Sequence, residues 1–281
     1  YYTLDNFTQR LALITGGSSG IGLALAKILA KSGSNVWILG RREDQLRIAL
    51  EVLESERKND QQKFGVIAAD VSNPNQILTE LPSFCERAGT PDYLINSAGI
   101  VHPGEFINLN LESFHAMMDV NYFGIVHCCK AIIPYMVRRS SGHIVNISSL
   151  AGIIGLYGYT GYSASKFAVR GFSDVLRSEL KSHNIHVSLV YPPDTQTPQL
   201  EYDNLHKPPI TKELSSTGGL LQPEEVAASI LRGIQHNKYI ITPGFEASLI
   251  YKIQGFTGNL VYRLMDLLVA QAQHKIEKKQ N

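Results

Sequence analysis

The sequence predicts one α/β domain built on a doubly wound parallel sheet. Three observations support this prediction: a length of 281 residues, short apolar runs that alternate with stretches of helical periodicity, and a glycine-rich turn after the first run. Strands that alternate with crossover helices form parallel sheets covered on both faces. Such sheets bind ligands at the carboxyl ends of their strands, so polar residues that follow an apolar run are the candidate site.

The first half of the chain begins with two strand–helix units. Residues 11–15 are a short apolar run that ends in glycines, and apolar residues then recur at helical spacing over 21–29 until Gly33 supplies a stop. Residues 36–39 form the second apolar run, and 46–53 mark one face of a charged helix. These units predict the order strand, helix, strand, helix.

The same alternation continues along the rest of the domain. Further strands are expected at residues 64–69, 93–96, 143–147, 187–191 and 239–242.

The segment 198–221 interrupts this regular pattern. It holds three prolines and two glycines where a connection is usually short, and we interpret it as an irregular candidate lid. A further helix is expected to start at Pro223. We therefore divide the chain into a catalytic domain at 1–244 and a helical extension at 245–281.

Composition excludes several classes of function. The net charge of +1 supplies no field that would gather nucleic acid, so no nucleic-acid partner is expected. The cysteines at 85, 128 and 129 match neither a disulfide framework nor a metal site, and the nine histidines form no metal-binding cluster. The first residues do not resemble a signal peptide. We expect a cytoplasmic protein without a metal.

The glycine-rich turn, TGGSSGIG at residues 15–22, is a candidate phosphate loop. Gly16, Gly20 and Gly22 lie between a strand and a helix, where missing side chains let backbone amides approach a pyrophosphate at the positive helix end. The alternative is a glycine-rich turn that only packs the helix on the strand.

The residues after the second strand indicate which nucleotide this loop would bind. An NAD enzyme usually has a carboxylate here, whereas this chain has Gly40, Arg41 and Arg42. A guanidinium favours a 2′-phosphate, so NADPH is expected. Glu43 could take the carboxylate role but begins a helix, and the two arginines could instead be a solvated pair.

Tyr162, Lys166 and Ser149 are the candidate catalytic residues. Tyr162 and Lys166 stand four residues apart, so on a helix they share one face. A nearby ammonium stabilises a phenolate, and we expect Lys166 to lower the pKa of Tyr162 and make it a usable acid/base. Ser149 follows a strand, where its hydroxyl can orient a substrate carbonyl. Taken alone, a Tyr-x-x-x-Lys pair is also common on surface helices.

Five motifs together resemble the short-chain dehydrogenase/reductases, over about residues 9–198. They are TGGSSGIG, NSAG at 96–99, MDVNYFG around Asn121, NISSLAG around Ser149, and YSASK. The resemblance implies a Rossmann fold in which Tyr162 gives a proton to a ketone oxygen, Lys166 holds the nicotinamide ribose, and Ser149 positions the carbonyl. It also implies that Asn121 holds a water that relays protons to Lys166. Ser148 is the adjacent alternative to Ser149, which we prefer on spacing.

The resemblance also implies which residues contact the cofactor. They are Gly16, Ser18, Ser19, Gly20, Ile21, Gly22, Arg41, Arg42, Asp70, Val71, Asn96, Ala98, Gly99, Tyr162, Lys166, Pro192, Thr195 and Thr197. Two departures stand out: NSAG replaces the usual NNAG, and Pro192-Pro193 replaces Pro-Gly. The second reduces backbone freedom near the nicotinamide.

The string PPDTQTPQLEYDNLHKP at 192–208 resembles the 3-ketodihydrosphingosine reductase branch more specifically. This resemblance implies NADPH-dependent reduction of 3-ketosphinganine to sphinganine. One alternative is a broader reductase of 3-oxoacyl thioesters or other lipid or small ketones. Another is a non-catalytic scaffold or sensor that binds NADP(H), against which the intact Ser149, Tyr162 and Lys166 argue.

The extension has apolar residues at helical spacing between 249 and 268. Its longest uncharged stretch, 253–262, is too short to span a bilayer of about 30 Å. It could lie on the cytoplasmic face of a membrane, line a lipid entrance, or pack against the domain or a sister subunit. Residues 111–136 suit the family's dimer-forming helix or a buried intrachain helix, and a homodimer or homotetramer is expected.

Overall fold

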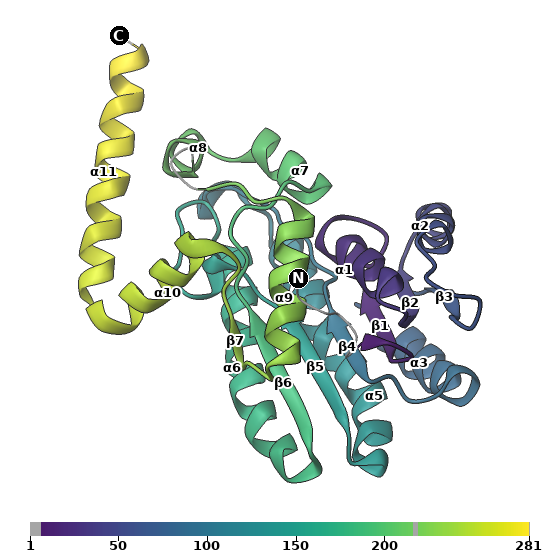
Figure 1. Ribbon diagram of the computed structural model, residues 1–281. Coiled ribbons are helices and arrows are strands. Elements are labelled where there is room, and N and C mark those ends of the chain that lie inside the picture. Colours follow the sequence, from purple (N-terminus) through teal and green to yellow (C-terminus); the bar gives the residue numbers. More distant parts are fainter. Residues whose placement is uncertain (1–6, 216–218, 281) are drawn as a thin grey trace.

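A parallel seven-stranded sheet forms the centre of the protein, for which a computed structural model describes residues 7–215 and 219–280 (Figure 1). The strand order is β3-β2-β1-β4-β5-β6-β7, so the order reverses between β1 and β4. The strands are β1 (Leu11–Thr15), β2 (Asn35–Gly40), β3 (Phe64–Ala68), β4 (Tyr93–Asn96), β5 (Gly142–Ile147), β6 (Ile185–Val190) and β7 (Ile240–Ile241). The predicted fold class is confirmed, and every expected strand is present.

The chain has helices on both faces of this sheet and further helices beyond its ends. They are α1 (Gly20–Lys31), α2 (Glu43–Ser55), α3 (Pro74–Ala88), α4 (Leu111–Met118), α5 (Gly124–Arg139), α6 (Thr160–Leu180), α7 (Pro198–His206), α8 (Pro209–Ser215), α9 (Pro223–Gln235), α10 (Gly244–Thr257) and α11 (Leu260–Gln280). Of these, α1, α2 and α9 lie on one face of the sheet, and α3, α5 and α6 lie on the other. Shorter turns are η2 (Phe106–Asn108), the π-helical η3 (Asp119–Phe123), η4 (Leu150–Gly152) and η5 (Lys181–His183).

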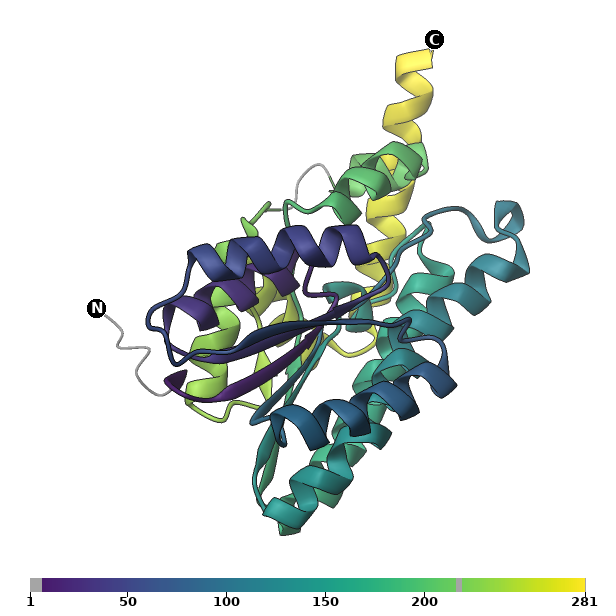
Figure 2. The same ribbon diagram turned by 90° about the vertical axis from the view of Figure 1, so that its right-hand side faces the viewer.

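Alternate strand residues build two separate cores. In β1, Leu13 packs among apolar residues of α3, α5 and α6, whereas Ile14 packs among those of α1, α2 and α9. Both side chains are fully buried. Because both faces are covered, the strands are continuous apolar runs, which is why the sequence reveals them. Figure 2 shows the two helical layers on opposite sides of the sheet.

The helical segment Leu111–Arg139 is apolar because the fold buries much of it. By length and composition it could cross a membrane, but half of its most apolar stretch lies inside the fold. Cys128, Cys129 and Ile132 of α5 belong to the core, and α5 packs on α3. Burial therefore accounts for the apolar character of this segment.

The segment 198–221 differs from the sequence-based expectation of an irregular connection. Its prolines start helices rather than break them, since Pro198 and Pro209 begin α7 and α8. Proline suits the first helical position, where its missing N–H leaves no bond unmade. Thr197 caps α7 by accepting a hydrogen bond from the Leu200 amide at 3.2 Å. The two helices lie at one end of the sheet (Figure 1).

The C-terminal part of the chain forms two helices that extend from the body (Figures 1 and 2). Gly258, with a φ of 50°, separates α10 from α11. α11 contacts α8, and Lys275 pairs with Glu213. Several large apolar side chains stay exposed, including Phe245 at 82% and Phe256 at 92%.

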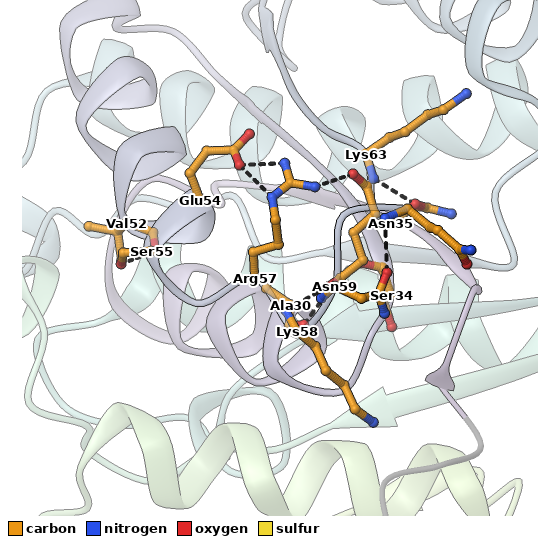
Figure 3. A network of polar contacts seen from close by, with 12 residues as sticks. Ala30, Ser34, Asn35, Val52, Glu54, Ser55, Arg57, Lys58, Asn59 and Lys63 are labelled. Carbon is orange, nitrogen blue, oxygen red and sulfur yellow. Dashed lines mark hydrogen bonds and ion pairs between the residues drawn. The ribbon is translucent and has the colours of Figure 1, made fainter.

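A network of hydrogen bonds stabilises the connection between α2 and β3 at the amino end of the strands (Figure 3). Gln62 is only 5% exposed and lies at its centre. Its side-chain amide makes four hydrogen bonds of 2.7–3.0 Å with backbone groups of Ala30, Ser34, Lys58 and Asn59. The Arg57 guanidinium adds bonds to Glu54 and to the Gln62 carbonyl oxygen. This network lies at the end of the sheet opposite to Ser149, Tyr162 and Lys166, which follow the carboxyl ends of the strands.

Candidate active site

Two adjoining cavities open at the carboxyl ends of the strands. The first, the strand-end cavity, has a volume of about 250 Å³ and is lined by residues that follow β1, β4, β5 and β6 and by α6 and α7. The second, the arginine cavity, has a volume of about 480 Å³ and is lined by residues that follow β2 and β3. Gly16, Ala98 and Gly99 line both. The two form one elongated site at the point where strand order reverses, as a dinucleotide requires.

The glycine loop is shaped to bind a pyrophosphate, because two of its positions have no space for a side chain. Gly16 has a φ of 65°, and a Cβ atom there would lie 2.8 Å from the Cα of Ala98. A Cβ atom on Gly22 would collide with the Gly16 carbonyl oxygen. α1 begins at Gly20, so the amides of its first turn are available to an anion in the cavity.

The remaining loop residues divide between the two cavities. Ser19, Gly20 and Ile21 line the strand-end cavity, and Ser18 lines the arginine cavity. The tight winding and the shared lining are compatible with a pyrophosphate held where the cavities meet.

Arg41 and Arg42 lie where the sequence predicts a 2′-phosphate contact. Both line the arginine cavity beside Asp70 and Val71. An Arg41 nitrogen is 3.8 Å from an Asp70 carboxylate oxygen, and the Arg41 side chain is 60% exposed. An exposed pair at this distance is weak, so the guanidinium is free to turn to a phosphate. Glu43 is the first residue of α2.

Ser149, Tyr162 and Lys166 meet in the strand-end cavity. Ser149 follows β5, and the other two project from α6. The Ser149 side chain acts on the Tyr162 phenol and helps to lower its pKa. The neighbouring Ser148 instead donates to the Lys166 carbonyl oxygen at 3.0 Å. This geometry favours Ser149 over Ser148 as the hydroxyl that faces a substrate.

Burial, rather than Lys166, controls the pKa of Tyr162. Desolvation raises the pKa of the phenol to about 12, and the side chains of Ser149 and Gln199 oppose this rise. The expectation that Tyr162 has a lowered pKa is therefore wrong in this structure. A phenol with a raised pKa stays neutral at physiological pH, which suits a proton donor more than a base.

Lys166 is the group whose proton is easily lost. It is 4% exposed, and burial lowers its pKa to about 8. Its Nζ donates to the Ile147 carbonyl oxygen at 3.1 Å and lies 5.6 Å from the centre of the Tyr162 ring. The ammonium and the phenol thus line the same cavity.

Asn121 connects two elements beside the site through hydrogen bonds of its side chain. Its amide oxygen accepts from the Ile100 N–H at 2.8 Å, and its amide nitrogen donates to the Ile100 carbonyl at 3.0 Å and to Ser165 at 2.9 Å. These bonds occupy the side chain, which therefore couples the loop after β4 to α6. Asn121 lies in the π-helical η3, a type of turn frequent at functional sites.

Asn96 is not brought to the cavities by the structure. Its side chain is 1% exposed and donates to Asn146 at 2.9 Å, inside the core. Asn146 in turn donates to Ser173 at 2.9 Å. The side chain therefore bonds within the core beside Asn146, with which Asn96 is in register across β4 and β5.

The loop after β6 completes the cavity wall. Pro192, Thr195 and Thr197 all line the strand-end cavity. Backbone hydrogen bonds of 2.9–3.0 Å between Leu221 and the stretch around Thr195 hold this loop in place.

α7 contributes residues that the sequence reasoning missed. Gln199 lines the cavity and helps to lower the pKa of Tyr162. Asp203 accepts hydrogen bonds from Tyr159 at 2.8 Å and Lys207 at 2.9 Å. The spacing of Asp203 and Lys207, four residues apart, was the available signal for a helix here. This spacing did not lead to a predicted helix, because the prolines around it are typical of an irregular segment.

The chain matches a known family over most of its length. A family model described as short chain dehydrogenase matches residues 10–207. The chain is 41% identical over 227 residues to a 3-ketodihydrosphingosine reductase of Mus musculus, covering 80% of this chain and 68% of that protein. It is 34% identical over 272 residues to a 3-ketodihydrosphingosine reductase of Dictyostelium discoideum, covering 92% and 81%. It is also 35% identical over 225 residues to a 3-oxoacyl-[acyl-carrier-protein] reductase of Chlamydia muridarum, covering 79% and 89%.

Solved structures share the fold at lower identity. A short-chain dehydrogenase from Sphingobium yanoikuyae in complex with NADPH superposes with a TM-score of 0.76 at 24% identity, covering 90% of this chain and 95% of that chain. A short chain dehydrogenase/reductase from Burkholderia phymatum in complex with NAD gives 0.80 at 21% identity, covering 94% and 97%. These similarities support the fold and leave the choice of nucleotide open.

Proposed function

The chain belongs to the short chain dehydrogenase family, and from this premise we propose that it reduces 3-ketosphinganine to sphinganine with NADPH. One observation carries the proposal: the strand-end cavity brings Ser149, Tyr162 and Lys166 together in a chain that is 41% identical to a 3-ketodihydrosphingosine reductase. The family makes the protein an oxidoreductase with a nicotinamide cofactor. The choice of NADPH and of the substrate is the proposal.

The arginine cavity supports NADPH over NADH. Arg41 and Arg42 line it, and a planar guanidinium pairs well with a phosphate. Gly16 to Gly22 would hold the pyrophosphate, and Lys166 with Thr195 and Thr197 would surround the nicotinamide end. The bound cofactor would supply the hydride.

The protein's own residues would handle the proton. The Ser149 and Tyr162 hydroxyls would hold the ketone oxygen, and Tyr162 would donate its proton as the alkoxide forms. Because burial keeps the phenol neutral, the acid is ready before substrate binds. Lys166, with a pKa near 8, would return a proton to Tyr162.

The cavity wall also suits a substrate with an alkyl chain. Val101, Ile147, Leu156 and Leu200 line the strand-end cavity together with its polar groups. Apolar side chains around a few oriented polar groups are typical of sites for amphipathic ligands.

Substrate turnover tests this proposal. Purified protein with NADPH should reduce 3-ketosphinganine with a specificity constant at least about tenfold above that for a 3-oxoacyl thioester. The opposite preference would favour a 3-oxoacyl reductase. The similarity to the Chlamydia muridarum protein supports that alternative. Binding of NADPH without turnover of any ketone would favour the non-catalytic scaffold.

We further propose that the extension at 245–281 is a separate unit that contacts the cytoplasmic face of a membrane. Phe245, Phe256, Leu260 and Leu267 are 62–92% exposed on α10 and α11, and charged residues lie among them. α11 contacts α8, so this apolar surface lies near the segment 198–221 that we interpret as a lid. A lipid substrate would then reach the cavity from the membrane. The homodimer or homotetramer stays a prediction.

A further inference from the structure

The strand-end cavity is lined by a buried carboxylate of which only one oxygen has hydrogen-bond partners in the described part of the chain. Asp203 projects from α7, is 6% exposed and lines this cavity. Its Oδ2 accepts hydrogen bonds from the Tyr159 hydroxyl at 2.8 Å and from Lys207 at 2.9 Å. Its Oδ1 has no hydrogen-bond partner within residues 7–215 and 219–280. A buried carboxylate oxygen without a donor is costly and is an expected binding point for one.

The charges around Asp203 do not balance. Asp194 also lines the cavity, and its carboxylate is 3.7 Å from the Lys207 ammonium. Lys207 is 1% exposed in its side chain and is shared by both carboxylates. With both carboxylates ionised, two negative groups with one shared ammonium leave a formal net charge of −1, of which Asp194, with a side chain 48% exposed, carries the part that faces solvent. A second cation would complete the set.

This negative charge lies next to the reacting position. The Tyr159 ring, whose hydroxyl donates to Asp203, is 5.8 Å from the Tyr162 ring. Asp203 and Asp194 also act electrostatically on the Tyr162 phenol, and both raise its pKa. A cation held by Asp203 would therefore lie close to a ketone whose oxygen is on Tyr162.

We propose that Asp203, assisted by Asp194, binds a protonated amino group on the carbon next to the substrate's ketone. This inference rests on the proposed function and adds a specificity determinant to it. 3-Ketosphinganine carries an amino group in this position, whereas 3-oxoacyl thioesters and simple ketones do not. The partnerless oxygen supplies the acceptor, and the net negative charge selects a cation over a neutral hydroxyl.

The first test compares two substrates on the unmodified protein. They are 3-ketosphinganine and the same long-chain hydroxy-ketone without the amino group, both with saturating NADPH. We expect kcat/KM to be about 10- to 100-fold higher for the amine, the range of a hydrogen bond to a charged group. Equal values would overturn the inference while leaving the proposed function standing. Reduction of neither ketone would overturn both.

The second test removes the charge. Asp203→Asn keeps an acceptor for Tyr159 and should lower kcat/KM for the amine about 10- to 100-fold while changing the value for the amine-free ketone less than about threefold. Glu201→Gln is the matched control, since it removes an exposed carboxylate from the same helix, and both substrates should keep their values. An equal loss on both substrates in Asp203→Asn would overturn the inference. Should this variant fail to fold, the two-substrate comparison decides alone.

Discussion

Tyr162 and Lys166 are shifted in opposite directions by the same cause. Burial disfavours the charged form of each, so the pKa of the phenol rises to about 12 and that of the ammonium falls to about 8. At neutral pH the tyrosine is neutral and the lysine is still mostly protonated. The pair is thus prepared to give a proton to a ketone, and the lysine is the member that titrates in a measurable range.

The pH dependence of ketone reduction should report Lys166. The charged form, which returns a proton to Tyr162, exists below a pKa of about 8. We therefore expect kcat to be constant from pH 6 to about 7.5 and to fall as pH rises through about 8. The assay should use the amine-free ketone, so that only the protein titrates. A rate that stays constant to pH 10 would contradict this role.

Arg41 should decide between the two nucleotides. Because a guanidinium beside the arginine cavity would pair with a 2′-phosphate, Arg41→Ala should weaken NADPH binding about tenfold and leave NADH nearly unchanged. Fluorescence titration of both nucleotides measures this. Arg47→Ala, which removes an exposed arginine from α2, is the control. Equal weakening of NADPH and NADH would refute the 2′-phosphate argument.

At the scale of elements, the strands could be predicted and α7 and α8 could not. Each strand is an apolar run because it is buried on both faces. In the sequence, Pro198 and Pro209 suggest that no helix passes through them. In the structure, each is the first residue of a helix. Whether a proline starts or interrupts a helix depends on the residues that follow and on packing, here the contact of α8 with α11.

The α2–β3 connection offers a stability test away from the site. Gln62→Ala removes a buried amide that makes four hydrogen bonds to backbone groups, and those groups would lose their partners. We expect the free energy of unfolding to fall by about 2–3 kcal/mol, measured by urea denaturation. Gln61→Ala, on the exposed neighbour, should change it by less than about 0.5 kcal/mol. Similar values for both variants would show that the network contributes little.

At the scale of the molecule, the part of the site carried by local motifs was predictable and the part made by distant contacts was not. The glycine loop, Ser149, Tyr162 and Lys166 were found because each motif follows a strand or shares a helix face. The contact of Asp203 with Tyr159 was not, because the two residues lie 44 positions apart in the chain. Likewise, the raised pKa of Tyr162 follows from burial, which a local motif does not encode.

The exposed apolar surface of the extension predicts membrane binding. Phe256 is 92% exposed on α10, so Phe256→Asp should reduce cosedimentation with anionic lipid vesicles at least about fivefold without changing turnover of a water-soluble ketone. Leu78→Asp, at an exposed leucine on α3, is the control and should bind as the unmodified protein does. Equal vesicle binding by all three proteins would refute the membrane contact.

Tyr162 is the proton donor to the ketone in the proposed reaction. The decisive measurement compares NADPH binding and 3-ketosphinganine reduction in the unmodified protein and in Tyr162→Phe. We predict that the variant binds NADPH within about twofold of the original and loses about 10²–10⁴-fold in kcat, because the substitution removes only the hydroxyl group that donates the proton. Turnover by the variant at a rate near that of the unmodified protein would contradict the account.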